Sequence, residues 1–486
     1  MREEDTSPGS GHVVVVGGGI AGLAAAHRLL GRGARVTVLE ASDRLGGKLL
    51  AGEIAGVRVD LGAESMLARR PEAVDLAREA GLGERLRPPA TATASLWTRG
   101  TLRPMPKGHV MGVPGSASAV SGVLSEEGLR RIERDADLPR TEVGEDIAVG
   151  AYVAARLGRE VVDRLVEPLL GGVYAGDAYR ISMRLAVPQL YAAARTHTSL
   201  TEAVREIQAK AAAAGQTGPV FMGIDGGVGR LPLAVAGSVT ARGGEILTGT
   251  PVTELRRTAA AGWRVVAGDR VLHADAVVLA LPAPAASALL RAEAPAAAAE
   301  LAAVEYASMA LVTLAYRAED ATLPEGSGFL VPPVDGHTIK ASTFASRKWG
   351  WIADQDPGLL VLRTSVGRYG DTEVLGRPDA DLVEVSRHDL REATGLDAEP
   401  VETRVTRWDD GLPQYPVGHH ARVARVRDHV GRLPGLAVCG AAYDGVGIPA
   451  CIASAYAAVD RLGGDGGALE ALRADPVQSL HGGAGE

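Results

Sequence analysis

The alternation of apolar and polar residues predicts a β-α-β unit at the start of the chain. Residues 12–16 and 35–39 are short apolar runs typical of buried strands, and residues 20–30 carry apolar side chains at helical spacing. A strand, a helix and a second strand in this order begin a parallel, doubly wound sheet.

Further along the chain the pattern changes several times. Helical spacing dominates residues 126–210, whereas residues 101–115 contain three prolines and are predicted to be irregular. Pro449 suits the first turn of a helix. The other predicted elements are helices at 147–157, 161–170 and 451–462 and strands at 220–224, 245–255, 271–281 and 435–438.

Composition narrows the class of protein. The chain has 486 residues, enough for two or three domains, and its net charge of -8 argues against nucleic acid as the main partner. Its two cysteines, Cys439 and Cys451, form no disulfide framework, which favours a reducing compartment and the cytoplasm. The most apolar stretch, 276–290, is short and contains prolines, so we expect no membrane span, although peripheral membrane contact stays open.

The first candidate site is the turn after the first strand. Gly17, Gly19 and Gly22 have the spacing that brings backbone against a pyrophosphate at a helix N-terminus, and Glu40 ends the second strand, where it can bond a ribose diol. This combination predicts a dinucleotide site. The alternative is a glycine turn in a plain βαβ unit.

The residues after Glu40 favour FAD over NAD. Arg44 can bind a pyrophosphate through two donors, and Gly46 and Gly47 let backbone pass close to a cofactor. A nicotinamide dehydrogenase has no need of this segment. The alternative for Arg44 is a solvated surface arginine.

Two later segments fit the same extended cofactor. Residues 60–65 form a small-residue turn suited to the edge of an isoalloxazine ring, and the glycine-rich run 440–450 leads into the predicted C-terminal helix. The positive end of that helix would face the flavin region where negative charge collects on reduction. The alternative is a buried glycine turn without a ligand.

Five motifs together carry a resemblance to a known family. The runs VVGGGIAGLAAAHRL and EASDRLGGK, MPKG at 105–108, EPLLGGVYAGD at 167–177 and YDGVGIPACIASA at 443–455 resemble bacterial protoporphyrinogen and coproporphyrinogen oxidases. The oxygen-dependent, coproporphyrin-forming enzymes of Gram-positive bacteria are the most similar in character, over residues 12–462. Monoamine oxidases and carotenoid desaturases share only the first two motifs.

The resemblance implies an α/β and α+β fold with a Rossmann-type FAD-binding domain, a mixed-sheet substrate domain and a helical subdomain that can lean on a membrane. We place the FAD-binding domain at 11–95, 211–298 and 431–465, the substrate domain at 96–115 and 299–430, the helical subdomain at 116–210 and a flexible tail at 466–486.

The implied reaction is the six-electron oxidation of coproporphyrinogen III to coproporphyrin III, with oxygen as acceptor and hydrogen peroxide as product, in heme biosynthesis. Protoporphyrinogen IX is the alternative substrate. An amine oxidase, a desaturase and a non-enzymatic FAD-binding protein are rival interpretations. The implied partners also include transient contact with a ferrochelatase. The redox step belongs to the cofactor, so we assign no side-chain base.

The resemblance also implies the residues of the site. Expected to hold FAD without a covalent bond are Gly17, Gly19, Ile20, Ala21, Gly22, Glu40, Ala41, Arg44, Gly46, Gly47, Lys48, Gly62, Ala63, Glu64, Ser65, Val252, Trp408, Gly440, Ala441, Val446, Gly447 and Ile448. Expected to bind the substrate are Arg69, Arg70, Gly171, Gly172, Tyr174, Lys340, Phe344 and Arg347.

Several of these residues have equally good structural explanations. Arg69 and Arg70 could be an exposed helix start, Tyr174 and Trp408 could be core, and the basic residues near 340–348 could be the solvated face of a strand. Cys451 could tether the flavin, but its place in a predicted helix favours packing. His419 and His420 lack a carboxylate partner, so we predict no metal there.

Overall fold

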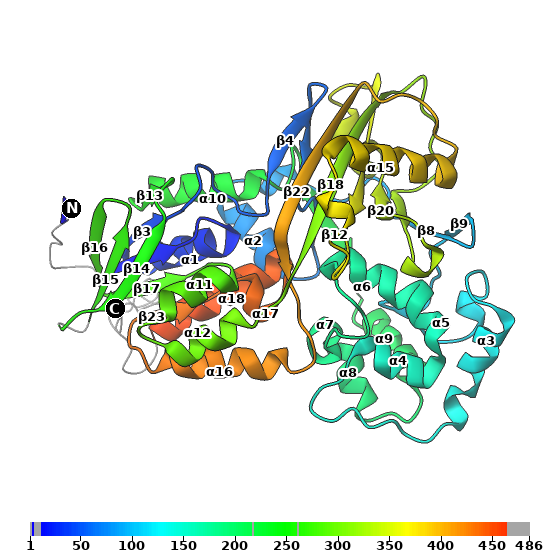
Figure 1. Cartoon of the computed structure of the whole chain (residues 1–486), viewed down its shortest axis with the longest axis horizontal. Helices are drawn as coiled ribbons and strands as arrows, with labels where there is room; N and C mark the ends of the chain where they lie inside the picture. Colours follow the sequence, from blue (N-terminus) through cyan, green and yellow to red (C-terminus); the bar gives the residue numbers. More distant parts are fainter. Residues whose placement is uncertain (1, 4–10, 216–217, 260–261, 464–486) are drawn as a thin grey trace, which may run out of the picture.

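The computed structural model describes residues 2–3, 11–215, 218–259 and 262–463, and its helices and strands form three parts. Figure 1 shows a parallel sheet with its helices at one end of the molecule and, at the other end, a mixed sheet above a group of helices. The predicted flexible tail at 466–486 lies outside the described residues.

The first part is built on a five-stranded parallel sheet of order β13-β3-β2-β17-β23. Its strands come from three separate stretches of sequence, so the domain is discontinuous, and the predicted opening β-α-β unit is confirmed. The β2 strand is buried throughout, which explains its unbroken run of valines. The elements are β2 (His12–Val16), α1 (Ile20–Gly31), β3 (Arg35–Leu39), β13 (Glu245–Leu247), β17 (Ala276–Leu279) and β23 (Leu436–Val438).

Two predicted strands in this part were wrong. The run 245–255 divides into β13 and β14 (Val252–Arg257), and the run 271–281 divides into β16 (Arg270–Ala274) and β17. In each case the two halves belong to different sheets, because β14 and β16 pair antiparallel with β15 (Trp263–Ala267) in a second sheet, where β1 (Arg2–Glu3) pairs parallel with β16. The breaks are short, residues 248–251 and Asp275, so the apolar runs on either side of each break resemble one continuous strand.

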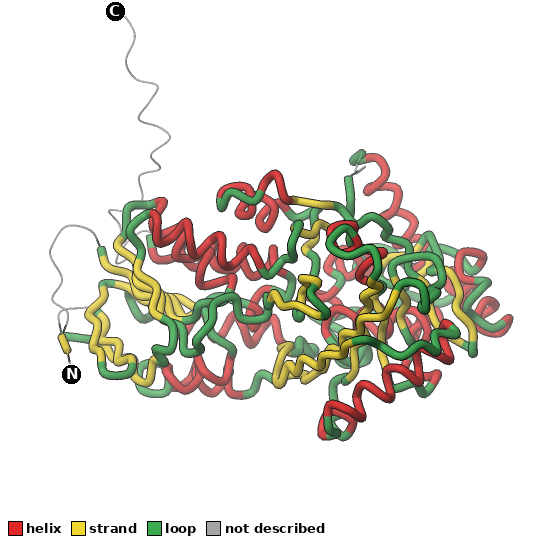
Figure 2. The backbone as a smooth tube through the Cα atoms, turned by 90° about the horizontal axis from the view of Figure 1, so that it is seen from above, coloured by secondary structure: helices red, strands yellow, loops and turns green. Residues whose placement is uncertain are grey.

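Helices cover both faces of the parallel sheet, as Figure 2 shows from above. On one face α1, α10 and α18 share a core with β2 and β3, and on the other α11, α12 and α16 share a core with β17 and β23. We therefore place the domain boundary before α16 rather than at residue 430. The bounds are α10 (Arg230–Ala241), α11 (Ala283–Leu290), α12 (Pro295–Ala302), α16 (His419–Gly431), α17 (Ala441–Asp444) and α18 (Ile448–Leu462).

The second part is a seven-stranded sheet of order β22-β18-β21-β20-β19-β8-β9. Its long strands β18 and β22 run side by side from the parallel-sheet part into this part (Figure 1), and α15 packs against its core. The elements are β8 (Ser95–Thr98), β9 (Thr101–Pro104), β18 (Tyr306–Arg317), β19 (Gly328–Leu330), β20 (Ile339–Thr343), α13 (Ala345–Lys348), α14 (Gly350–Ala353), β21 (Leu359–Val366), α15 (Asp379–Thr394) and β22 (Glu402–Pro413).

The third part is helical, as predicted for 126–210. Its core contains a fully buried ion pair in which Arg156 Nε lies 2.7 Å from an oxygen of Asp135. Residues 101–115 are less irregular than predicted, because β10 (His109–Val110) and β11 (Val113–Pro114) form a hairpin there. The helices are α3 (Glu126–Glu133), α4 (Val149–Leu157), α5 (Arg159–Val161), a π-helical turn η4 (Val162–Val166), α6 (Glu167–Tyr174), α7 (Met183–Ala186), α8 (Pro188–Ala194) and α9 (Leu200–Ala213).

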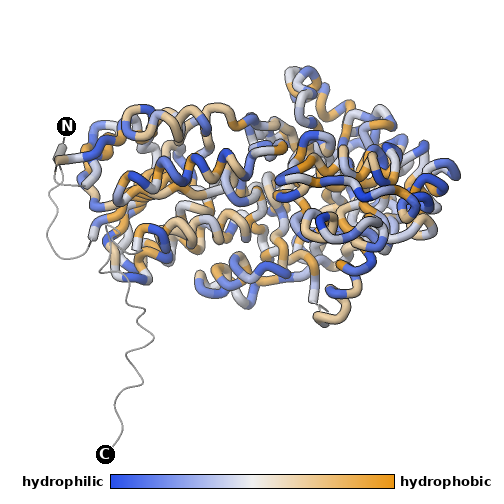
Figure 3. Tube along the Cα trace, turned by 90° about the horizontal axis from the view of Figure 1, so that it is seen from below, coloured by the Kyte–Doolittle hydropathy of each residue, from blue (hydrophilic) through white to orange (hydrophobic). Residues whose placement is uncertain are grey.

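The remaining described elements are short. They are β4 (Ala51–Ile54), β5 (Val57–Asp60), β6 (Met66–Leu67), α2 (Pro71–Glu79), β7 (Leu86–Arg87), β12 (Phe221–Ile224) and the 3-10 turns Gly83–Arg85, Ser118–Val120, Arg134–Asp137, Pro333–Asp335 and Val374–Gly376. Among the described residues, no helix combines the length and the apolar character that crossing a membrane requires. Figure 3 shows hydrophilic positions recurring along the outer helices.

Candidate functional site

The loop from β2 to α1 has glycines of two kinds. A Cβ on Gly17 would lie 2.5 Å from the Ala280 carbonyl oxygen, and a Cβ on Gly22 would lie 1.8 Å from the Gly17 carbonyl oxygen, so close packing of the chain itself requires both glycines. A Cβ on Gly19 would meet no atom within 4 Å. Gly19 caps α1, whose first turn has no acidic residue. The positive end of this helix therefore faces open space suited to an anion.

Glu40 lies beside this loop. One carboxylate oxygen accepts from the Gly18 N–H (2.6 Å), and the other accepts from the N–H and hydroxyl of Ser42 (2.8 and 2.7 Å). The side chain is half-buried. These bonds fix the carboxylate next to the anion-binding loop, where a ribose hydroxyl can use its remaining lone pairs.

The segment after Glu40 returns to the same loop. The Gly46 N–H donates to the Gly18 carbonyl oxygen (2.9 Å), and Gly46 has φ +103°, a conformation that favours glycine. Arg44 is exposed and donates to the Gly47 carbonyl oxygen (2.9 Å). The structure thus brings Arg44 and Gly47 to the rim of the loop, with the arginine free to turn toward an anion.

A second helix N-terminus lies at the start of α18. The helix begins at Ile448, earlier than predicted, with Pro449 in its first turn as expected, and that turn has no acidic residue. Gly447 caps it and is exposed, and Gly440 lies against Ala21 of α1. Segments far apart in sequence therefore present two uncompensated helix N-termini on the same side of the sheet.

The turn at residues 60–65, here called the Gly62 turn, is tied to several elements. Asp60 accepts from the N–H groups of Val228 and Gly229 (both 2.8 Å), and burial raises its pKa to about 6. A Cβ on Gly62 would lie 2.2 Å from the Lys48 carbonyl oxygen and 3.1 Å from the Trp408 ring. Trp408 also donates to the Leu61 carbonyl oxygen (3.1 Å), so it packs directly on this turn.

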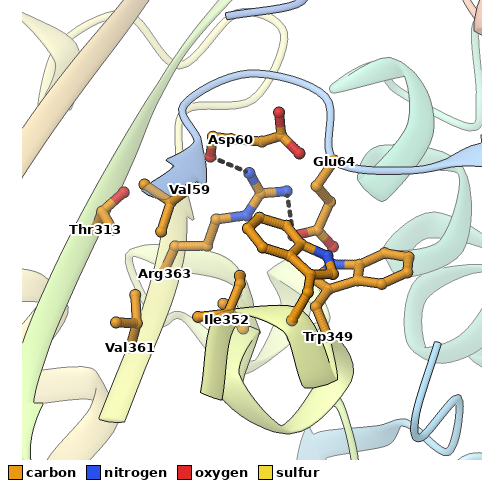
Figure 4. A pocket seen from close by; sticks show the side chains of 10 residues that line it. Val59, Asp60, Glu64, Thr313, Trp349, Ile352, Val361 and Arg363 are labelled. Carbon is orange, nitrogen blue, oxygen red and sulfur yellow. Dashed lines mark hydrogen bonds and ion pairs between the residues drawn. The ribbon is translucent and has the colours of Figure 1, made fainter. Parts of the chain in front are cut away.

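Glu64 is the most strongly paired carboxylate of the turn. Lys348 Nζ lies 2.6 Å from one oxygen and Arg363 Nη2 lies 3.0 Å from the other, and Arg363 also donates to the Gly62 carbonyl oxygen (2.8 Å). Figure 4 shows the Arg363 guanidinium between Asp60 and Glu64. Burial would raise the pKa of Glu64, but Arg363 and Lys348 outweigh it and lower the pKa to about 2. Glu64 is therefore ionised at neutral pH.

A small cavity lies against this ion-pair network. Its walls include Glu64, Arg363 and the aromatic side chains drawn in Figure 4, and it offers about 10 Å³ to the centre of a water-sized sphere, room for about one water molecule. Three buried atoms of lining residues, Thr313 Oγ1, Trp349 Nε1 and Trp351 Nε1, have no hydrogen-bond partner within the described protein. A bound water would satisfy them.

The residues expected to bind substrate divide into an accessible group and a second group within residues 340–347. Arg69, Arg70, Gly172 and Tyr174 keep accessible surface, and Arg70 lies 2.7 Å from Glu72. Gly171 has no neighbour within 4 Å of the position of a Cβ, so the α6 backbone there can be approached closely.

Of the other three, Lys340, Phe344 and Arg347, only Lys340 is a buried basic side chain. Phe344 is core, only 2% exposed and packed on Phe329, and Arg347 bonds the Pro324 carbonyl oxygen. The geometry gives neither residue a side chain directed at a ligand. Sequence reasoning missed Lys348 as a partner of the Gly62 turn, although it stands next to Arg347 in the same basic run.

Comparisons with known proteins agree with this geometry. The family model of flavin-containing amine oxidoreductases matches residues 20–463. The chain belongs to this family. It is 40% identical to a coproporphyrinogen III oxidase of Mycobacterium tuberculosis (strain ATCC 25618 / H37Rv) over 452 residues, which cover 92% of this chain and 96% of that one. It is 32% identical to the human protoporphyrinogen oxidase over 485 residues, covering 93% and 98%.

Solved structures show the same relationship. A crystal structure from Exiguobacterium sp. 255-15 with a protoporphyrinogen oxidase name matches with a TM-score of 0.82 and 33% identity, covering 93% of this chain and 99% of that one. A putrescine oxidase bound to putrescine shares the fold, with a TM-score of 0.67 at 17% identity and 93% and 99% coverage. The resemblance and the Rossmann-type fold predicted from the sequence are confirmed.

This flavin-dependent oxidoreductase has a site that fits its cofactor. Open space at Gly19 and two bare helix N-termini suit a pyrophosphate and an electron-rich ring edge, and Glu40 suits a ribose. Lys48 remains accessible, yet surrounding protein lowers the pKa of its ammonium.

The other predicted cofactor residues lie around these features. Ile20, Ala21, Gly22, Ala41, Ala63, Ser65, Val252, Ala441 and Val446 are in or next to the loops and helix starts described above.

Two further residues have firm structural roles. Cys451 is buried in α18, where its thiol points to the Gly445 carbonyl oxygen (3.6 Å) and burial raises its pKa to about 12. His419 is also buried, stacked on Tyr415 at 4.8 Å, with Nε2 2.9 Å from the Ala442 carbonyl oxygen.

Proposed function

We propose that this chain oxidises coproporphyrinogen III to coproporphyrin III in heme biosynthesis, with non-covalent FAD and molecular oxygen. The observation that carries the proposal is the 40% identity to a coproporphyrinogen III oxidase over 92% of this chain. When bound, the flavin supplies the redox chemistry, taking a hydride from the substrate and passing two electrons to oxygen. Removal of six electrons then consumes three oxygen molecules and yields three molecules of hydrogen peroxide.

The protein's own residues bind and orient the cofactor. Glu40 and the N-terminus of α1 would hold the ribose and pyrophosphate, and the network of Glu64, Lys348 and Arg363 fixes the Gly62 turn, which would support the ring. Keeping this turn rigid keeps the ring and the substrate at a fixed distance, which is the main demand when the cofactor performs the chemistry.

Non-covalent binding is supported by the state of Cys451. Covalent attachment needs a reactive thiolate, whereas the buried thiol of Cys451 has a pKa raised to about 12 and remains protonated. Acid precipitation of the purified holoprotein should therefore leave all yellow flavin in the supernatant. Flavin in the washed pellet would contradict this.

The experiment that tests the function follows porphyrin fluorescence and peroxide after the holoprotein is mixed with coproporphyrinogen III in air. We expect three peroxides for each porphyrin formed. Because porphyrinogens also oxidise without enzyme, the matched control is the same protein stripped of FAD. If the holoprotein is no faster than this control, the proposal is wrong.

Protoporphyrinogen IX is the second candidate substrate, favoured by the 32% identity to the human protoporphyrinogen oxidase. Coproporphyrinogen carries four propionates and protoporphyrinogen two, so a more basic chamber favours the first. Parallel assays decide between them. A higher kcat/KM for protoporphyrinogen would reverse the assignment, and turnover of a primary amine alone would make the protein an amine oxidase.

A further inference from the structure

Within the described residues, two neighbouring basic side chains lack a carboxylate partner, and of these Lys340 is buried and Arg368 is half-buried. Lys340, on β20, is 6% exposed, and its ammonium bonds the Gly367 carbonyl oxygen (2.9 Å) and lies 3.9 Å from the Met309 sulfur. Arg368, next along the chain from Gly367, donates to the Val331 and Ile339 carbonyl oxygens (3.2 and 3.5 Å). Within the described part of the chain, neither cation lies within 4.0 Å of a carboxylate oxygen.

Nearby carboxyl groups do not neutralise the pair. Asp389 accepts from the N–H groups of Thr338 and Ile339 (both 2.9 Å), and Glu167 accepts from the Ala178 N–H (2.6 Å). Burial raises the pKa of Glu167 to about 7, so it is only partly ionised at neutral pH. Asp371, which also acts on Arg368, is exposed. These carboxyl groups act on Arg368 from a distance, and none of them forms an ion pair with either basic side chain.

On one side the pair adjoins the Gly62 turn. Lys340 touches Met309, and Met309 lies opposite Trp408 in the β18–β22 pairing, while Trp408 packs on Gly62. Contacts through Met309 and Trp408 thus connect the Lys340 ammonium to the Gly62 turn, which the proposed function places beside the flavin.

On the other side the pair adjoins α6. Tyr369, the residue after Arg368, donates its N–H to the Ala175 carbonyl oxygen (2.6 Å) at the end of that helix. The cations therefore lie between the Gly62 turn and the helix whose Gly171 backbone is open, which is where the proposed function requires the macrocycle.

Burying a cation without a counter-ion is unfavourable by several kcal/mol in general, and proteins keep such groups where a ligand supplies the missing charge. We propose that Lys340 and Arg368 together form a carboxylate site that binds one propionate of the porphyrinogen. This inference rests on the proposed function and deepens it. An arginine and a lysine suit the task, because the guanidinium binds both carboxylate oxygens and the ammonium adds a third donor.

The charge of this site depends on the protonation state of Lys340. Burial, with repulsion from Arg368, lowers the pKa of Lys340 to about 7, so the empty site holds a partly neutral amine at neutral pH. An arriving carboxylate raises this pKa again. Arg368, Glu167, Asp371 and Asp389 are the other charged groups that act on the pair, and burial raises the pKa of Glu167 into the same range. Binding should therefore take up a proton and weaken as the pH rises above 7.

The test measures binding of the fluorescent product coproporphyrin III and of its tetramethyl ester to the holoprotein. The Lys340→Met and Arg368→Gln variants should each weaken coproporphyrin binding by about tenfold or more, and leave ester binding unchanged. The control Lys210→Met removes a surface ammonium, 75% exposed, and should change neither. Flavin content and far-UV circular dichroism show that each variant is folded and loaded.

The outcomes separate the two proposals. If the wild-type protein binds coproporphyrin and oxidises its porphyrinogen but both variants bind as tightly as wild type, the carboxylate site is wrong and the function stands. If coproporphyrin and ester lose affinity equally, the two residues shape the chamber and do not recognise charge, which also overturns the inference. If wild type turns over no porphyrinogen, the function itself fails.

Discussion

Replacing Glu64 by glutamine removes the negative charge that holds two cations at the Gly62 turn. Lys348 and Arg363 approach the Glu64 carboxylate at 2.6 and 3.0 Å, and the three side chains are 18%, 13% and 9% exposed, in that order. The glutamine side chain keeps the shape but would leave two buried cations without a counter-ion. We expect Glu64→Gln to destabilise the fold and to weaken FAD binding, because the turn beside the ring loses its anchor.

The magnitude follows from the pKa of Glu64. Its pKa falls from 4.5 to about 2, and each unit is worth about 1.4 kcal/mol, so the ion-pair network contributes on the order of 3 kcal/mol to stability at neutral pH. Removing one partner of a buried pair generally costs about 3 to 5 kcal/mol, which agrees.

The stability difference between wild type and Glu64→Gln should depend on pH in a defined direction. A carboxylate with a lowered pKa stabilises the folded state above its unfolded pKa and loses that effect as the pH falls toward the folded value. The difference between wild type and Glu64→Gln should therefore be constant above about pH 5 and shrink between 4.5 and 2. Urea unfolding, followed by tryptophan fluorescence at several pH values, measures it.

The matched control is Glu254→Gln, which breaks an ion pair of similar length with Arg264 (2.5 Å) whose side chains are 41% and 33% exposed. A surface pair of this kind is worth at most about 1 kcal/mol. If Glu64→Gln lowers stability no more than this control, or if its effect is unchanged at pH 3, the argument from buried charge compensation is refuted.

Four further substitutions test the site. Gly19→Val should lower FAD affinity and leave apoprotein stability nearly unchanged, whereas Gly22→Ala, with a Cβ 1.8 Å from the Gly17 oxygen, should destabilise the apoprotein by about 2 kcal/mol or more; thermal melts and FAD retention on a desalting column separate them. Cys451→Ser should release flavin in acid as wild type does, and a different released fraction would implicate the thiol. Thr313→Val should destabilise by about 1 kcal/mol if the cavity holds a water, while a gain in stability in urea unfolding would show a dry cavity.

The parts of the fold that were predictable from sequence are those specified locally. The strand, glycine turn and helix from residue 12 to 31 lie next to one another in the chain, and the requirement for glycine at Gly17 and Gly22 comes from contacts within this unit and with the residue that follows β17. The broken strands were less visible. Gly249 and Pro251 mark the first break and Asp275 marks the second, where its carboxylate accepts the His12 N–H (2.7 Å), but each break is short and apolar runs lie on both sides of it.

The electrostatic centre of the site was not predictable in this way. Glu64, Lys348 and Arg363 are brought together by three different elements, and no spacing in the sequence relates them. The basic run near 340–348 was recognised as a candidate, but burial assigned its members opposite roles. Phe344 lies in the core, Lys348 pairs with Glu64 of the Gly62 turn, and Lys340 lies in the interior without a counter-ion. Only tertiary packing decides which face of a short segment meets a ligand.

The two pairs of basic side chains on these neighbouring segments therefore have different roles. Lys348 and Arg363 share the carboxylate of Glu64, so their charge is neutralised within the protein and their role is to hold the Gly62 turn. Lys340 and Arg368 come from the same two stretches of chain but bond only backbone carbonyls and a thioether. The net charge of -8 means that acidic side chains outnumber basic ones, yet within the described residues none forms an ion pair with Lys340 or Arg368. This arrangement fits the two proposed roles. The neutralised pair fixes the cofactor-binding turn, and the unneutralised pair beside it binds an anionic substrate.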